Sequence, residues 1–192
     1  MLRSSDFNLR KLHERDLPDV FAWRNSNRVR HNMFNSHLIS WEEHQSWFAR
    51  VKNDNKNIYM IFECQGTPIG VTYFTNINWR DKVGFWGFYL GMDSLPRGTG
   101  AVMGWFSLEY AFAILELRKL SGEVFSFNLA SVSLFKKMGF FEEGRFREHV
   151  YKEGLFEDVI FLSLLKRDWE RDKSKVEKLI FIERPSYELC DS

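Results

Sequence analysis

The stretch from Val83 to Leu117 reads VGFWGFYLG, MDSLPRGTGA and VMGWFSLEYAFAILEL. We expect the first part to form a buried strand, the second a turn with glycines at Gly98 and Gly100, and the third a long apolar helix. A strand that leads through glycines into a helix N-terminus can bind phosphate, because the first backbone N–H groups of a helix have no partner within it. The rest of the chain is interpreted around this stretch.

The length and composition of the chain indicate a single domain. A chain of 192 residues is long enough for one full core and short for two. The 19 Phe and 7 Trp make the core aromatic, and a net charge of +1 gives no electrostatic argument for nucleic-acid binding. Cys64 and Cys190 do not suggest a disulfide framework, and no apolar run approaches a membrane span. We expect a cytoplasmic protein that binds neither nucleic acid nor membrane and holds no metal.

The order of the segments predicts an α+β fold. Four segments read as helices: one that opens at Asp16 and Pro18 and becomes irregular from Asn25, one capped by Ser40 and Glu43, the long helix at 102–117, and a short one capped by Asn128. The expected strands, in chain order, are 7–12, 58–64, 69–78, 83–91, 119–127, 140–154 and 155–166. We assign 1–166 to the domain and 167–192 to a C-terminal appendage of it.

The glycine turn has three interpretations. Gly98, Gly100 and Gly104 lie one residue off the dinucleotide fingerprint, but residues 91–96 separate them from the strand, and no acidic residue ends the next strand. A P-loop is excluded because no Lys-Ser/Thr pair follows the glycines. A plain loop beside a core helix is the second interpretation. A site for pantetheine and pyrophosphate is the third.

Two motifs favour the third interpretation. RGTGA (97–101) follows the strands, and NLASVSLFKKMGFFEEGR (128–145) follows the next strand. In this order and spacing the chain resembles the GNAT acetyltransferases over residues 6–166. The resemblance implies a mixed, mostly antiparallel twisted sheet of about seven strands flanked by helices, with acetyl-CoA as co-substrate.

The resemblance also implies a set of cofactor contacts. The pyrophosphate is expected on the backbone amides of 98–102, and pantetheine beside 89–91, where a backbone amide would polarise the thioester carbonyl. Val102 stands where the family prefers Gly or Ala. The implied cofactor-binding residues are Tyr89, Leu90, Gly91, Arg97, Gly98, Thr99, Gly100, Ala101, Val102, Asn128, Phe135 and Lys137.

The N-terminal half is expected to select the acceptor. Its pattern WRN at 23–25, VR at 29–30, Met33, and EH at 43–44 before Trp47 resembles the enzymes of pseudaminic-acid biosynthesis. Those enzymes acetylate the 4-amino group of a UDP-linked dideoxy amino sugar. Relatives that acetylate ribosomal-protein N-termini or polyamines are less similar. The implied substrate-binding residues are Arg24, Asn25, Arg30, Met33 and His44.

Physical chemistry leaves several acceptors open. The diphosphate of a nucleotide sugar needs cations, which Arg24 and Arg30 supply, whereas a polyamine needs a carboxylate cluster that this chain lacks. His44 serves equally well as a histidine packed between Trp41 and Phe48. An N-terminal peptide or another small amine, and a non-catalytic domain that binds acyl-CoA, are the alternatives.

The usual acid and base of the family are absent. Phe135 replaces the tyrosine that protonates the leaving thiolate, and Ser126 replaces a glutamate base. The catalytic candidates are therefore Tyr89 first, then Tyr73 and Ser126 as a water-mediated relay. We expect direct transfer in a ternary complex. A homodimer formed through strand edges or the C-terminal tail is compatible with the sequence, which does not show it.

Overall fold

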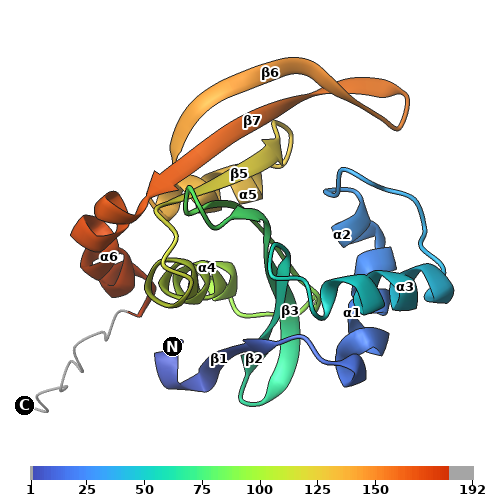
Figure 1. The fold of residues 1–192 in the computed structure, drawn as a ribbon, viewed down its shortest axis with the longest axis horizontal. Coiled ribbons are helices and arrows are strands. Elements are labelled where there is room, and N and C mark those ends of the chain that lie inside the picture. The colour runs from blue at the N-terminus through green and yellow to red at the C-terminus, as the bar shows by residue number, and fades with distance from the viewer. Residues whose placement is uncertain (1, 182–192) are drawn as a thin grey trace, which may run out of the picture.

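The computed structural model describes residues 2–181, and one seven-stranded sheet runs through it (Figure 1). The strands lie in the order β1-β2-β3-β4-β5-β7-β6, and every neighbouring pair is antiparallel except β4 and β5. This confirms the mixed, mostly antiparallel sheet expected from the sequence. The bounds are β1 (Phe7–Lys11), β2 (Ile58–Cys64), β3 (Thr67–Asn78), β4 (Val83–Leu90), β5 (Lys119–Phe125), β6 (Phe141–Lys152) and β7 (Leu155–Leu165).

Helices cover both faces of the sheet (Figure 1). One face carries α1 (Leu17–Asn25), α2 (Asn27–Arg30) and α3 (Trp41–Val51). The other carries α4 (Thr99–Glu109), which continues as a π-helical turn (Tyr110–Ile114), together with α5 (Leu129–Lys137) and α6 (Lys166–Ile180). Short 3-10 turns at Ser4–Asp6 and Glu14–Asp16 flank β1.

Local capping chemistry sets several of these boundaries as expected. Ser40 and Glu43 form a reciprocal capping box at the start of α3. The Asn128 side chain accepts a 3.1 Å hydrogen bond from the Ser131 amide, and Gly139, with a φ of 91°, follows the end of α5. Gly98, with a φ of 100°, precedes α4 in the left-handed conformation that favours glycine.

Three local expectations were wrong. The segment after Asn25 is not wholly irregular, because Ser26 caps the short helix α2. The long helix begins at Thr99 rather than at 102 and passes into a π turn at Tyr110. Asp16 precedes α1 without a side-chain capping bond, since its carboxylate instead accepts hydrogen bonds of 2.6 and 2.7 Å from the Arg10 guanidinium.

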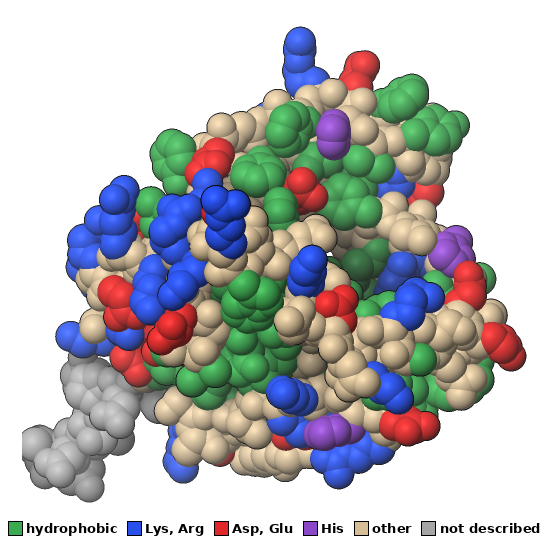
Figure 2. Space-filling model, viewed as in Figure 1, with side chains coloured by type: hydrophobic (Ala, Val, Ile, Leu, Met, Phe, Trp, Pro, Cys, Tyr) green, Lys and Arg blue, Asp and Glu red, His purple; other side chains and the backbone are tan. Residues whose placement is uncertain are grey.

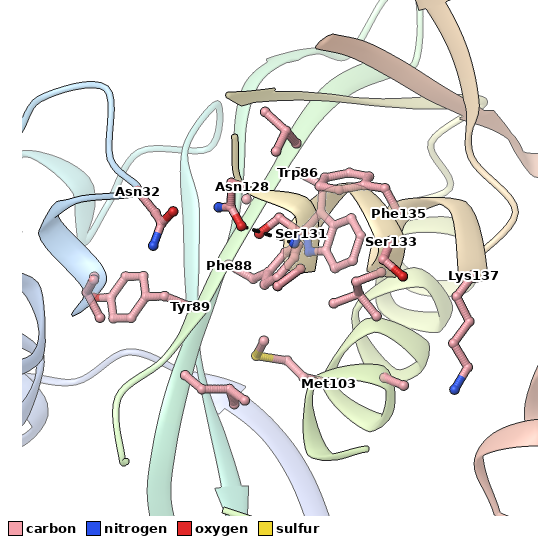
Figure 3. A pocket seen from close by; sticks show the side chains of 18 of the residues that line it. Asn32, Trp86, Phe88, Tyr89, Met103, Asn128, Ser131, Ser133, Phe135 and Lys137 are labelled. Atoms are coloured by element: carbon pink, nitrogen blue, oxygen red, sulfur yellow. Dashed lines mark hydrogen bonds between the residues drawn. The ribbon is translucent and has the colours of Figure 1, made fainter. Parts of the chain in front are cut away.

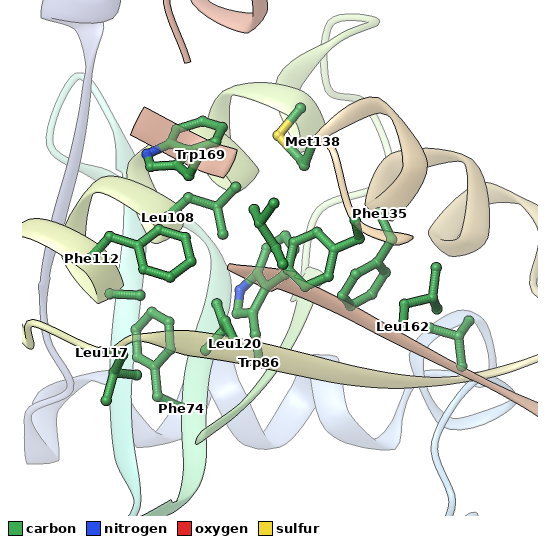
Figure 4. Packing of buried hydrophobic residues seen from close by; sticks show 14 of the residues in the cluster. Phe74, Trp86, Leu108, Phe112, Leu117, Leu120, Phe135, Met138, Leu162 and Trp169 are labelled. Atoms are coloured by element: carbon green, nitrogen blue, oxygen red, sulfur yellow. The ribbon is translucent and has the colours of Figure 1, made fainter. Parts of the chain in front are cut away.

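The region assigned to a C-terminal appendage begins with a packed helix. α6 buries Trp169, whose indole Nε1 donates a 2.7 Å hydrogen bond to Glu109 on α4. Trp169 thereby joins the main core cluster between the sheet and α4, where Trp86, Phe112 and Phe135 also pack (Figure 4). Residues 182–192 of the appendage lie outside the described residues.

Candidate functional site

The central feature of the site is the divergence of the two parallel strands. β4 and β5 pair only from Val83 to Phe85, opposite Lys119 to Ser121. Beyond Phe85 the backbone edge of β4 that faces β5 carries no strand partner. A large cleft of about 940 Å³ opens there, between β4, the N-terminus of α4, α5 and residues near α2 (Figure 3). An extended ligand can therefore pair with the free edge of β4.

The N-terminus of α4 closes one end of the large cleft. The Thr99 amide already donates to the Pro96 carbonyl, and the amides of Ala101 and Val102 donate to the Gly98 carbonyl. Gly98 and Gly100 line the large cleft, so their amides are the ones available to an anion. The Val102 side chain is fully buried in the core, so this departure from the family pattern does not narrow the cleft.

The opposite wall of the large cleft is α5. Phe135 is 2% exposed, and its ring lies against Gly122, where an added Cβ would come within 2.3 Å of Phe135 Cε1. Phe135 also packs edge-on against Trp86 at 4.9 Å between ring centroids (Figure 3). A phenyl ring at this position fills space but has no proton to donate to a bound ligand. Lys137 on α5 and Arg97 before α4 line the same cleft as cations.

A small cleft of about 640 Å³ lies on the other face of β4. It runs among α1, α3, the loop after α2 and strands β2 to β4. Both clefts share Met33, Tyr73 and Tyr89 in their walls. Phe88 and Tyr89 project from opposite sides of β4 (Figure 3), so this strand contributes side chains to both clefts. We call the place where the clefts meet the junction.

Two glycines make room for aromatic rings beside Tyr89. A Cβ on Gly87 would fall 2.2 Å from Tyr73 Cε2, and one on Gly91 would fall 2.0 Å from Trp23 Cδ2. The ring of Tyr73 therefore lies close against the backbone at Gly87, and the ring of Trp23 close against the backbone at Gly91, just beyond the end of β4. Tyr59 stacks on Tyr73 at 5.3 Å between ring centroids and extends this aromatic wall into the small cleft.

Burial keeps the tyrosines at the junction protonated. It raises the pKa of Tyr73 to about 12, and it raises the pKa of Tyr89 further, although the positive charge of Arg24 opposes the shift. Both hydroxyls therefore remain proton donors across the physiological range. Tyr89 suits the role of acid or hydrogen-bond donor, and it does not suit the role of base.

The structure brings most of the expected cofactor residues together. All of them line the large cleft except Gly91, Thr99 and Val102. The Gly91 amide donates a 2.8 Å hydrogen bond to the Ile69 carbonyl, so it is engaged in the sheet. Thr99 is buried, with its hydroxyl bonded to the Pro96 carbonyl at 2.7 Å.

The expected substrate residues divide into two groups. Arg24, Met33 and His44 line the small cleft. Asn25 and Arg30 do not line it, because their side chains hold the loop after α2. Asn25 exchanges two 3.0 Å hydrogen bonds with the backbone of Ile39, and Arg30 donates to the Ser36 carbonyl at 2.9 Å.

His44 lines the small cleft and is also buried among neighbouring side chains. It is 2% exposed, its Nε2 lies 3.1 Å from the Leu17 carbonyl oxygen, and its ring stacks on Trp47 at 5.1 Å. Burial lowers the pKa of His44, so the neutral ring is favoured. Its nitrogen toward Leu17 is then an N–H donor, which ties α3 to α1.

Ser126, expected in a water-mediated relay, lies away from both clefts. It follows the end of β5, its amide donates to the Asp158 carbonyl of β7 at 2.9 Å, and it lines neither cleft. Glu123 on β5 lines the large cleft instead, and it is the one carboxylate among the described residues that do so. Alternation along KLSGEVF, with Leu120 and Val124 in the core, was the signal that could have identified Glu123.

Residues 2–181 contain no grouping of three or more His, Cys, Asp or Glu side chains arranged to hold a metal ion. None of the helices described in that range is long and apolar enough to cross a membrane.

Comparison with known proteins relates this geometry to a family. The model of the acetyltransferase (GNAT) domain matches residues 9–160. The chain is 24% identical over 164 residues to the spermidine N(1)-acetyltransferase of Vibrio cholerae, covering 85% of this chain and 95% of that enzyme. It is 25% identical over 135 residues to the acetyltransferase PseH of Campylobacter jejuni, covering 69% of this chain and 82% of that protein.

A solved structure agrees in fold. The spermidine N-acetyltransferase from Vibrio cholerae in complex with CoA and spermine has a TM-score of 0.82 at 23% identity, covering 86% of this chain and 99% of that one. The family match spans most of the chain and includes the diverging strands, the glycine turn and α5. The chain therefore belongs to the GNAT acetyltransferase family and is an acyltransferase enzyme.

Proposed function

We propose that this enzyme transfers the acetyl group of acetyl-CoA directly to the amine of a nucleotide-linked amino sugar, of the UDP-4-amino-4,6-dideoxy type. The observation that carries the proposal is the junction. A cofactor in the large cleft and an acceptor in the small cleft would meet at Met33, Tyr73 and Tyr89, which line both. Two clefts that meet in this way favour a ternary complex over a covalent acetyl-enzyme.

The large cleft fits acetyl-CoA, which supplies a reactive thioester when bound. The amides of Gly98 and Gly100, at the positive end of α4, would hold the pyrophosphate together with Arg97 and Lys137. The free edge of β4 from Trp86 to Leu90 would pair with the pantetheine amides. A backbone N–H of this edge would then stabilise negative charge on the thioester oxygen.

The residues of the chain would move two protons. The amine must lose a proton as its nitrogen bonds to the carbonyl carbon, and the sulfur must gain one as the carbon–sulfur bond breaks. The Tyr89 hydroxyl, kept protonated by burial, would donate to the sulfur. Glu123 in the large cleft would accept the proton of the amine through water. Tyr73 would position the acceptor.

The small cleft supports an amino-sugar acceptor better than a polyamine. Its wall includes the aromatic side chains of Tyr59 and Trp47, which pack edge to face and offer apolar surface to a sugar or a base. A polycation needs several free carboxylates, but of the two that line the small cleft, Glu42 and Glu43, the second is already engaged with the Ser40 amide and with His37. The similarity to PseH points the same way, whereas the similarity to spermidine acetyltransferase favours a polyamine as the second candidate.

A panel of acceptors tests the proposal. Release of CoA thiol would be followed with acetyl-CoA and, in turn, a UDP-4-amino-4,6-dideoxy sugar, spermidine and an N-terminal peptide. We expect the highest kcat/KM with the sugar nucleotide and intersecting initial-velocity lines. A higher kcat/KM for spermidine would overturn the acceptor, and ping-pong kinetics would overturn direct transfer. Cofactor binding without transfer to any amine would favour a non-catalytic role.

A further inference from the structure

Three cationic side chains gather beside the junction without an anionic partner. Arg24 on α1 and Arg30 on α2 are half-buried, and Lys152 at the end of β6 is 5% exposed. Within residues 2–181, no carboxylate lies within ion-pair distance of any of the three. Buried cations are normally paired, because taking a charge out of water is costly.

Their hydrogen bonds all go to neutral oxygens. Arg24 donates through Nη2 to the Asn35 carbonyl. Arg30 donates to the Ser36 carbonyl at 2.9 Å, and also to the amide oxygen of Asn27 at 2.7 Å. Lys152 donates to the Met33 carbonyl at 3.0 Å, across 119 residues of sequence. These bonds fix the positions of the three cations without supplying a negative charge.

Two guanidinium nitrogens remain without any partner. Arg24 Nη1 and Arg30 Nε are buried from solvent and donate to no acceptor among the described residues. More than about 90% of buried polar groups in proteins are hydrogen-bonded, so an orphaned cationic donor calls for an explanation. An anionic group placed against Arg24 would satisfy the donor and offset the charge together.

The location connects this group to the acceptor. Arg24 lines the small cleft, and Lys152 is bonded to Met33, which belongs to both clefts. Figure 2 shows the surface hollowed between the β6–β7 hairpin and the helices α2 and α3, with Lys and Arg side chains at its edge. Burial chiefly lowers the pKa of Lys152, and the charges of Arg24 and Arg30 lower it as well, while the carboxylates of Glu153 and Glu157 oppose the shift. All three charges therefore act on one place.

We propose that Arg24, in the wall of the small cleft and supported by the neighbouring positive charges of Arg30 and Lys152, forms an anion site that binds a phosphate or carboxylate group of the acceptor. The inference rests on the proposed function and deepens it, because it assigns to the acceptor an anionic group close to its amine. It also predicts discrimination against polyamines, since a polycation placed here would meet the positive charge of Arg24 and of its two neighbours.

Calorimetric titration of the CoA-saturated enzyme tests the site. Saturation with CoA occupies the helix N-terminus of α4, which would otherwise bind phosphate too. UDP, pyrophosphate, glutarate and spermidine serve as probes, so that phosphate and carboxylate sources are distinguished. We expect binding of UDP or pyrophosphate, or else of glutarate, and no binding of spermidine.

Variants assign the binding to these residues. Arg24→Met should weaken binding of the anionic probe about 10- to 100-fold, the worth of a charge-assisted hydrogen bond. Arg147→Met removes the same charge from an exposed position on β6 and is the matched control, with the affinity expected to stay within about twofold. Arg24→Lys and Lys152→Met provide a second route if Arg24→Met does not fold, and Lys152→Met should also weaken binding.

The outcomes separate the site from the function. Equal affinity of Arg24→Met, Lys152→Met and Arg147→Met for the probes, or binding of spermidine alone, would overturn the anion site. Arg24-dependent binding of UDP without acetylation of any amino sugar would leave the site standing and remove the proposed acceptor. Acetylation of the sugar nucleotide with a KM unchanged by Arg24→Met would keep the function and remove the site.

Discussion

The ring of Tyr73 occupies the space that a side chain on Gly87 would need, because a Cβ there would fall 2.2 Å from Tyr73 Cε2. Gly87→Ala must therefore push Tyr73 away from β4 and out of the junction. We expect kcat/KM to fall at least about tenfold and stability to fall by about 1–3 kcal/mol, as for an overpacked site. Steady-state kinetics and urea unfolding measure the two effects.

Gly144→Ala is the control for Gly87→Ala. An added Cβ at Gly144 on β6 meets no atom within 4 Å, so the same substitution should leave kinetics and stability nearly unchanged. If Gly87→Ala also retained full activity, the position of Tyr73 on β4 would not matter for the reaction.

Tyr89 is the expected proton donor. Replacing Tyr89 with Phe keeps the ring and removes the hydroxyl, so kcat should fall about 10²-fold with little change in stability. Because burial raises the pKa of Tyr89 above the usual range, the wild-type rate should show no loss from its ionisation up to about pH 9. Rate profiles against pH for both proteins provide the measurement.

Tyr110→Phe tests whether loss of any buried tyrosine hydroxyl has this effect. Tyr110 stacks on Phe74 in the core cluster and lines neither cleft. Its variant should retain the wild-type rate. An unchanged rate in Tyr89→Phe would assign that tyrosine to packing alone.

The sequence predicted the features that local motifs encode. The capping box of Ser40 and the cap of Asn128 act within three or four residues, so their helices begin where expected. The glycine turn before α4 is encoded equally locally. These short-range signals, in their order along the chain, predicted the α+β class, and the resemblance to the GNAT acetyltransferases added the mixed sheet.

Long-range geometry escaped prediction. Lys152 meets Met33 across 119 residues, and no local pattern indicates such a contact. The family resemblance suggested Ser126 as a relay residue, but Ser126 follows the end of β5 and lines neither cleft, whereas Glu123 lines the large cleft. Asp16 was expected to cap α1 because of its residue type before Pro18, and its ion pair with Arg10, six residues earlier, could not be read from that local pattern.

Glu123 is the expected proton acceptor of the amine. Glu123→Gln keeps the size of the side chain and removes the base, so kcat/KM should fall about 10²- to 10⁴-fold and lose the carboxylate limb of its pH profile. Glu148→Gln on β6 makes the same change at an exposed position outside both clefts and should be neutral. Wild-type kinetics in Glu123→Gln would show that bulk water or another group takes the proton.

His44 should make the fold sensitive to acid. Burial lowers the pKa of His44 below its unfolded value of about 6.5, so the unfolded chain binds the proton more readily than the folded one. The stabilisation that the neutral His44 ring contributes is therefore fully present above the unfolded pKa of about 6.5. It is lost as the pH falls through the pKa of His44 in the folded protein. For one group, the free energy of unfolding should decrease by up to about 1.4 kcal/mol per pH unit.

His44→Gln isolates this contribution. Loss of the stacked ring should lower stability at pH 8, but the difference from the wild type should narrow between pH 7 and pH 5, because glutamine does not titrate. His149→Gln, on the exposed strand β6, controls for a histidine outside the core. Urea unfolding at each pH gives the slopes. Parallel slopes for His44→Gln and the wild type would show that His44 has the same pKa in the folded and the unfolded protein. The packed, neutral ring would then not stabilise the contact between α1 and α3.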